Sequence, residues 1–111
     1  MEQTINKAEV LGRVGNEPRI SQTEEGRRVI RFSIATSEFI RQLNGDLREE
    51  TTWHRIVAWE GKENNHFDLI KKGLRVRAKG RIRTNSYEKD GQQKYSQEIL
   101  AQSLQIEDSE S

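Results

Sequence analysis

The sequence contains no cysteine and no long hydrophobic run. Without cysteine the chain can form neither a disulfide framework nor a thiolate metal site, which fits a reducing compartment. No stretch is long enough to cross a bilayer, and the opening MEQTINKAEV lacks both the basic start and the apolar run of a signal peptide. We therefore expect a soluble cytoplasmic protein with no membrane contact.

Groups that could carry catalysis are also scarce. The two histidines, His54 and His66, fall on different predicted elements, and no spaced acidic cluster accompanies them to complete a metal site. No glycine-rich phosphate loop precedes a helix, since Gly12 and Gly15 lie in or just after a predicted strand. The sequence therefore predicts a protein that is not an enzyme and that has no metal site and no cofactor.

Positive charge, in contrast, is concentrated in one segment. The chain has 19 basic and 18 acidic residues, yet residues 71–83 hold seven of the basic ones and no acid, which leaves 12 basic against 18 acidic residues elsewhere. The seven are Lys71, Lys72, Arg75, Arg77, Lys79, Arg81 and Arg83. This segregation predicts an electropositive surface for an anionic partner, with chance clustering as the alternative.

The order of the basic residues indicates an extended strand. In LRVRAKGRIRT, residues 74–84, every second position is basic, which places five cations on one face and apolar residues on the other. The apolar face can join a core, while the basic face must meet water, an anion or another chain. The alternative is a solvated strand that uses its charge to prevent edge pairing.

The remaining pattern predicts one all-β domain. Turn signals at Gly26, Gly45 and Gly91 separate predicted strands, and a short helix is predicted at residues 62–72. The five strands are predicted at residues 7–15, 27–38, 51–61, 74–88 and 94–107. Three strands, one short helix and a final hairpin is the element order of a five-stranded Greek-key OB-fold barrel. We therefore expect an OB fold over residues 1–106 and a short acidic tail at 107–111, with an unrelated small β-barrel as the alternative.

Two tryptophans lie on the same side of the predicted third strand as an arginine. Trp53, Arg55 and Trp59 alternate with residues of the opposite face, and Tyr87 continues the odd-numbered face of the basic strand. Aromatic faces for unpaired bases, combined with cations for phosphates, are typical of proteins that bind single-stranded nucleic acid. The alternative is that Trp53 and Trp59 fill the core.

Several segments together resemble the bacterial single-stranded DNA-binding protein family. In order along the chain they are INKAEVLGRVGNEPR, FSIATSE, TTWHRIV, KKGLRVRAKGRIRT and DGQQKYSQEI. The resemblance covers nearly the whole chain at near family spacing. It implies an OB-fold subunit that coats single-stranded DNA during DNA replication, recombination and repair, without strong sequence preference and without catalysis.

The resemblance also implies site residues. Trp53 matches a base-stacking tryptophan, Trp59 stands where phenylalanine is usual, and Tyr87 stands where tryptophan is common. After TSE the family usually has another stacking tryptophan, and here Phe39 is the candidate to replace it. The basic residues expected to meet the DNA backbone are Arg55, Lys72, Arg81, Arg83 and Lys94.

A homo-oligomer is implied as well, with a tetramer favoured over a dimer. His54 matches a subunit contact, and the early part of the basic strand lies where two dimers of the family meet. Arg75, Arg77 and Lys79 would face their own copies across that symmetric contact unless acids such as Glu9 pair with them.

The end of the chain departs from the family. The long glycine- and glutamine-rich tail with an acidic tip is missing after QIEDSES, so protein partners recruited by such a tip are not expected. A phage, plasmid or other mobile-element member, or a trimmed nucleoid-associated bacterial protein, would have this form. The alternative functions are a protein-interaction module of a replication-restart or plasmid or phage replication assembly, and a domain that binds chiefly RNA.

Overall fold

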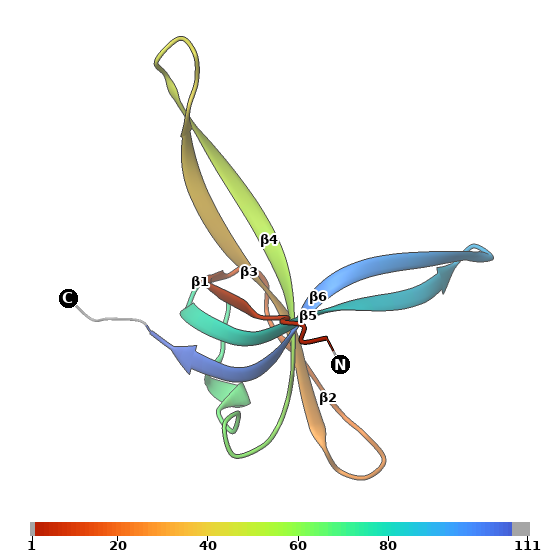
Figure 1. The fold of residues 1–111 in the computed structure, drawn as a ribbon. Coiled ribbons are helices and arrows are strands. Elements are labelled where there is room, and N and C mark those ends of the chain that lie inside the picture. The colour runs from red at the N-terminus through yellow and green to blue at the C-terminus, as the bar shows by residue number, and fades with distance from the viewer. Residues whose placement is uncertain (1, 108–111) are drawn as a thin grey trace.

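The computed structural model describes residues 2–107, which form an all-β fold (Figure 1). The strands are β1 (Ala8–Val14), β2 (Arg19–Gln22), β3 (Arg28–Arg41), β4 (Leu47–Trp59), β5 (Arg75–Lys89) and β6 (Gln92–Ile106). One short 3-10 helix, η1 (Phe67–Leu69), lies between β4 and β5.

The sheet closes on itself into a barrel. Its strand order is β1-β5-β6-β4-β3-β2, and β1 also pairs with β3 through Arg13 with Ala35 and Val14 with Ile34. Five strands thus form the barrel, while the four-residue β2 pairs with β3 at its margin. The predicted five-stranded OB fold is confirmed, and β2 is a strand that the sequence did not predict.

The helix predicted over residues 62–72 is wrong in extent, because only η1 forms. Asn64 explains the difference. Its buried side chain donates to the carbonyl oxygens of Trp59 (3.3 Å) and Gln102 (3.2 Å) and accepts from the Leu104 N–H (2.9 Å). These bonds fix the segment as a loop against β6, since an asparagine that binds distant backbone groups competes with helix formation.

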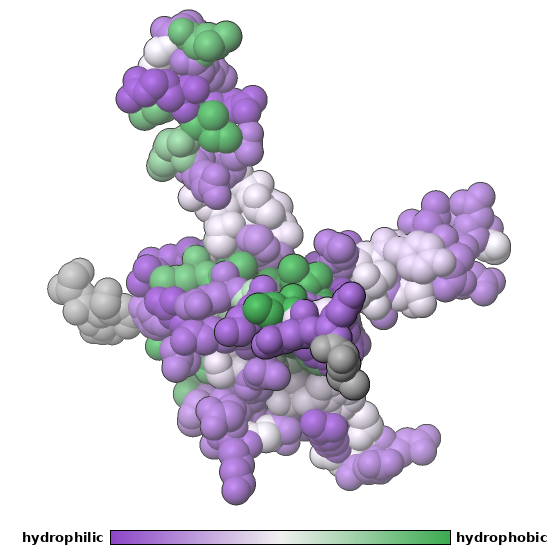
Figure 2. Space-filling model, viewed as in Figure 1, coloured by the Kyte–Doolittle hydropathy of each residue, from purple (hydrophilic) through white to green (hydrophobic). Residues whose placement is uncertain are grey.

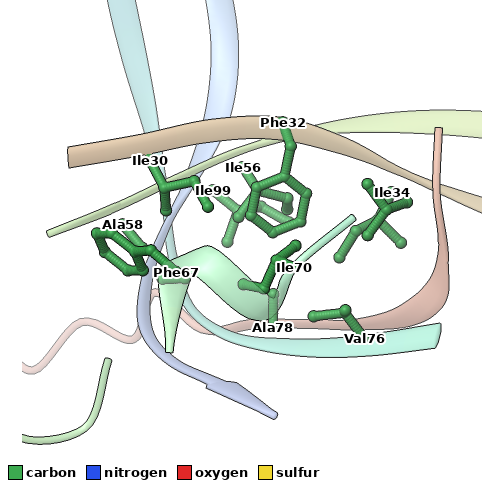
Figure 3. Close-up of a cluster of buried hydrophobic side chains, with 12 residues drawn as sticks. Ile30, Phe32, Ile34, Ile56, Ala58, Phe67, Ile70, Val76, Ala78 and Ile99 are labelled. Atoms are coloured by element: carbon green, nitrogen blue, oxygen red, sulfur yellow. The ribbon is translucent and has the colours of Figure 1, made fainter. Parts of the chain in front are cut away.

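The barrel interior is filled by side chains that alternate along the strands (Figure 3). In β3, Ile30, Phe32 and Ile34 are buried while Arg31 is exposed, as successive side chains of a strand point to opposite sides. The buried cluster comprises Val14, Ile30, Phe32, Ile34, Ile56, Ala58, Phe67, Ile70, Val76, Ala78, Ile99 and Ala101. Neither tryptophan belongs to it, so the alternative that Trp53 and Trp59 fill the core is wrong.

One irregularity keeps the basic residues of β5 on a single side. The register shifts from Lys79 opposite Ser103 to Gly80 opposite Ala101, so the extra residue of the bulge, Gln102, lies in β6. The alternation of β5 is therefore unbroken, and its five predicted cations all lie on the outward side of the strand. In β6, by contrast, the inward positions change at the bulge from odd-numbered residues, such as Ile99 and Ala101, to even-numbered ones, such as Leu104.

Two long hairpins extend from the barrel as arms (Figure 1). The strands of the β3–β4 arm and of the β5–β6 arm extend closer to their turns than the sequence predicted. The predicted turns are confirmed, and Gly45 (φ 92°) and Gly91 (φ 77°) adopt the left-handed backbone that such turns require.

Backbone hydrogen bonding extends one residue beyond the end of β6. The Glu107 N–H donates to the Arg75 carbonyl oxygen at 2.8 Å, so Glu107 continues the pairing of β6 with β5. The rest of the predicted acidic tail, residues 108–111, lies outside the described residues.

Candidate nucleic-acid interface

The outward side of β4 carries the candidate stacking residues. Trp53 is 61% exposed and Arg55 is exposed, whereas Trp59 is half-buried and Val57 between them is buried. The even-numbered His54 points to the other side of the strand, where its Nε2 lies 2.8 Å from Thr36 Oγ1. The structure therefore brings Trp53, Arg55 and Trp59 onto one surface, as the alternation predicted.

The ring of Trp53 lies directly against the backbone of Gly15. A Cβ atom on Gly15 would overlap two ring carbons of Trp53. Gly15 is itself fixed, because its N–H donates to the Ser33 carbonyl oxygen at 2.9 Å, and Asn16 Oδ1 accepts from the Ser33 N–H (2.9 Å) and Oγ (2.8 Å). Gly15 therefore positions the Trp53 ring. The sequence indicated only that Gly15 lies in or just after a strand and did not indicate this role.

Trp59 has a cation on one of its faces. The guanidinium carbon of Arg27 lies 4.6 Å from the centroid of the Trp59 ring, within the range of a cation–π contact. One ring face is therefore covered in this structure. Arg27 was absent from the predicted site, since nothing in its sequence position indicates that it reaches a residue of β4.

A row of charged residues crosses three neighbouring strands beside Trp53. Arg55 on β4 precedes the paired residues Ile56 and Ile99, Glu98 precedes Ile99 on β6, and Arg83 on β5 is the register partner of Glu98. We call the outward surface formed by Trp53, Arg55, Glu98 and Arg83 the Trp53 face. Glu98 is its one buried member, and nothing in the sequence indicated that this residue would be buried.

The β5–β6 arm continues this surface. Tyr87 is the register partner of Lys94, and both lie on the same side of the ribbon as Arg83 and Arg81. All but the half-buried Arg83 are exposed. The predicted DNA-binding residues of β5 and β6 are thus brought together with those of β4.

A further aromatic residue, Tyr95, lies on the opposite side of the β5–β6 arm. Tyr95 is the register partner of Ser86 and is 68% exposed. The sequence prediction did not include Tyr95.

The β3–β4 arm carries the remaining predicted aromatic residue. Phe39 is exposed opposite Glu49, and its odd-numbered position places it on the same side of β3 as Ala35, the register partner of Trp53. Figure 2 shows apolar side chains near the tip of this arm, where Leu43 and Leu47 are also exposed.

Lys72 lies in the turn before β5 and not on a strand. It is exposed just before Gly73, whose N–H donates to the Val14 carbonyl oxygen at 2.8 Å. Val14 precedes Gly15, so Lys72 lies at the end of the barrel where the Trp53 ring rests.

An open groove lies between the two arms. β4 and β6 pair only over Ile56–Ala58 and Ile99–Ala101, so the arms diverge beyond these residues. The resulting space has a volume of about 480 Å³, and its lining includes Lys7, Trp53, His54, Arg55, Ile82 and Glu98. A groove with an exposed indole and cations at its wall can accept an unpaired base and its phosphates.

The predicted oligomer residues lie mainly on another surface. On the outward side of β1 and β5, Arg77 forms an ion pair with Glu9 at 2.5 Å and a second with Glu107. We call this surface, which also includes Lys79 opposite Glu9 and Arg75 opposite Arg13, the Arg77 face. The hydrogen bond from Arg77 lowers the pKa of the Glu107 carboxyl, and the hydrogen bonds to Glu107 and Glu9 raise the pKa of Arg77. Glu9 thus pairs with the basic strand within one chain.

No metal-binding cluster and no membrane-spanning helix were found among residues 2–107. Histidine, aspartate and glutamate side chains do not gather in groups of three or more there. Likewise, no helix in that range is long and apolar enough to cross a membrane.

Comparison with known proteins gives consistent matches over almost the whole chain. Among curated relatives, the single-stranded DNA-binding protein 1 of Chlorobaculum tepidum is 38% identical over 108 residues, which is 96% of this chain and 67% of the relative. The single-stranded DNA-binding protein of Xanthomonas axonopodis pv. citri is 33% identical over 107 residues, which is 96% of this chain and 59% of the relative. The chain therefore spans about three fifths to two thirds of the length of these relatives.

Solved structures agree with the fold. A Plasmodium falciparum SSB in complex with ssDNA superposes with a TM-score of 0.81 at 36% identity and covers 97% of this chain and 99% of that one. A deletion mutant of the single-stranded DNA binding protein from Thermus aquaticus gives a TM-score of 0.80 at 23% identity, over 94% of this chain and 51% of that one, and supports the fold alone. The model of the single-strand binding protein family matches residues 5–107. With this match and these relatives, the chain belongs to the single-strand binding protein family.

Proposed function

We propose that this protein binds and coats single-stranded DNA, without catalysis and without strong sequence preference, during DNA replication, recombination and repair. The observation that carries the proposal is the Trp53 ring, which is 61% exposed beside Arg55 at the groove between the two arms. The family membership and the ssDNA in the complex of the Plasmodium relative support the same ligand.

The chemistry of binding follows from the aromatic and the basic side chains on the Trp53 face and beside it. Unpaired bases stack on Trp53, on the open face of Trp59 and on Tyr87, and stacking contributes roughly 1–3 kcal/mol per base. Arg55, Lys94 and their basic neighbours contact the phosphates. Stacking tolerates every base because each has a π face, so sequence preference is weak.

The protein acts as a homo-oligomer, with a tetramer ahead of a dimer. Arg77 supports this part of the proposal, because Glu9 and Glu107 neutralise it within one chain. A symmetric contact across the Arg77 face therefore does not bring Arg77 against its own copy as an unpaired charge. Light scattering tests this point, and a monomer at micromolar concentration would contradict it. The expected place of action is the cytoplasm of a bacterial cell, since the relatives from Chlorobaculum tepidum and Xanthomonas axonopodis pv. citri are bacterial proteins.

Titration with oligo-dT, followed by intrinsic tryptophan fluorescence, tests the proposed ligand. We expect quenching that saturates and that reverses with salt, with a log–log slope of about −0.7 for each phosphate neutralised. The same titration on a fluorescein-labelled oligonucleotide, followed by anisotropy, measures affinity independently of the tryptophans. Absence of binding in both measurements would reject the proposal.

A further inference from the structure

Glu98 is a buried anion in the middle of a basic surface. Among residues 2–107 it is the one charged residue that is buried, at 5% exposure, although it lies on the outward side of β6. Burying a carboxylate is costly unless charged partners compensate for the lost water. Its partners therefore indicate what the residue does.

The partners of Glu98 are arginines of the Trp53 face and its margin. Arg83 Nε donates to Glu98 Oε1 at 2.9 Å, and Arg31 Nη1 lies 3.7 Å from Glu98 Oε2. Arg55 flanks the same position on β4, one residue before the register pair Ile56 and Ile99. Two arginines thus contact a single carboxylate, and these three side chains together carry a net charge of +1.

The arginines keep part of their binding capacity. The side chains of Arg83 and Arg31 are 35% and 51% exposed, while that of Glu98 is 4% exposed. A guanidinium has five N–H donors, and Glu98 occupies a minority of them. A DNA phosphate can therefore approach the outer side of these arginines while the carboxylate remains beneath them.

We propose that Glu98 is a built-in competitor for DNA phosphate that holds Arg31 and Arg83 and weakens the binding of the backbone at this point. The inference rests on the proposed binding of single-stranded DNA and adds how the affinity of that site is set. Because the carboxylate and a phosphate are attracted to the same guanidinium groups and repel each other, removing the carboxylate charge strengthens the attraction for DNA.

The test is the isosteric substitution Glu98→Gln, measured by anisotropy with labelled oligo-dT over a series of salt concentrations. We expect binding about three- to tenfold tighter at low salt, since one repulsive charge is removed from a partly screened site. The log–log salt slope should become steeper by about 0.7, because one more cation of the cluster is available to neutralise a phosphate. Equal or weaker binding by the folded variant would overturn the inference.

A matched control removes the same charge elsewhere. Glu60 also pairs with an arginine, Arg28, at 2.5 Å, but on the inward-facing side of the strands. Glu60→Gln should leave the affinity and the salt slope at wild-type values. A gain as large as that of Glu98→Gln would show an effect of net charge alone and would count against a specific role.

A double-mutant cycle separates competition from structural support. In an Arg83→Gln background, Glu98→Gln should give a clearly smaller gain, because the carboxylate acts through the guanidinium that it holds. A purely structural role changes the unfolding temperature and leaves the salt slope unchanged. Glu98→Met provides a second uncharged variant of similar length if Glu98→Gln does not fold, since apolar replacement of a buried ion is often tolerated.

The wild-type titration distinguishes a failure of the proposed function from a failure of the role proposed for Glu98. If the wild-type protein fails to bind oligo-dT, the proposed function is wrong. If it binds and the folded Glu98 variants bind no more tightly, only the competing role of Glu98 is wrong.

Discussion

The basic strand β5 contributes to two surfaces that use arginine in different ways. On the Arg77 face, one arginine meets two partly exposed carboxylates, those of Glu9 and Glu107. On the Trp53 face, Arg83 shares one buried carboxylate, Glu98, with Arg31. The two pairings are opposite, because Arg77 has two carboxylates to itself whereas Glu98 is shared by two arginines. The pairing of the cations therefore indicates which part of the strand is available for DNA.

The largest expected loss of DNA affinity tests whether bases stack on the Trp53 face. Trp53→Ala should weaken oligo-dT binding by roughly 1–3 kcal/mol, because one stacked base loses its aromatic partner. The unfolding temperature should change little, since the side chain is 61% exposed. Tyr95→Ala removes a similarly exposed aromatic ring from the other side of β6 and should have a smaller effect. Anisotropy titrations compare the two, and an equal loss would contradict the assignment.

The next effect tests how the Trp53 ring is positioned. Gly15→Ala places a Cβ where ring carbons of Trp53 now lie, so the indole must move. We expect a loss of about 1 kcal/mol or less in oligo-dT binding, because the displaced ring still offers part of its surface. Gly61→Ala is the control, since a Cβ there meets nothing within 4 Å. Tryptophan emission should shift in the first variant and stay constant in the second.

A third prediction compares the arginines of the two surfaces directly. Arg55→Gln should reduce the magnitude of the salt slope by about 0.7, as expected when one phosphate contact is lost. Arg77→Gln should leave the slope unchanged, because Glu9 and Glu107 already neutralise that guanidinium. The mass of both variants is checked by light scattering, so that a change in assembly is not mistaken for a change in contact. Equal slopes for the two variants would remove the distinction between the surfaces.

The smallest effect concerns pH. Arg77 lowers the pKa of Glu107 through a hydrogen bond, so their pair stabilises the fold fully above the unfolded pKa of the carboxyl, about 4.3. This contribution is lost as the pH falls below that value and through the lower pKa of the folded state. In thermal unfolding between pH 7 and pH 3, Glu107→Gln should lose less stability on acidification than the wild type. Parallel curves would contradict the prediction.

Side-chain alternation made most of the barrel predictable. A period of two in residues 74–84 placed Val76 and Ala78 inside and the cations outside, and the structure agrees. The prediction depended on β5 remaining regular, and it held because the bulge falls at Gln102 in β6. The sequence contained no sign of which strand would take the extra residue.

The missed features depend on contacts between residues far apart in the chain. Asn64 reads as part of a polar helix, yet it bonds to Gln102 and Leu104 and ends up in a loop. Glu98 lies in an alternating strand like any surface acid, and its burial depends on arginines supplied by β3 and β5. Local patterns cannot reveal such pairs, because they arise only when the strands meet.

The short seam between β4 and β6 has a consequence for folding. The β3–β4 and β5–β6 hairpins are local and can form early, whereas the parallel pairing of Ile56–Ala58 with Ile99–Ala101 joins distant parts of the chain and carries a larger loop-closure cost. Trp53 belongs to the first hairpin, and Arg83 and Glu98 belong to the second. The proposed DNA site therefore forms only once this long-range pairing is made, and a DNA strand that binds both hairpins favours the closed barrel over its partly folded precursors.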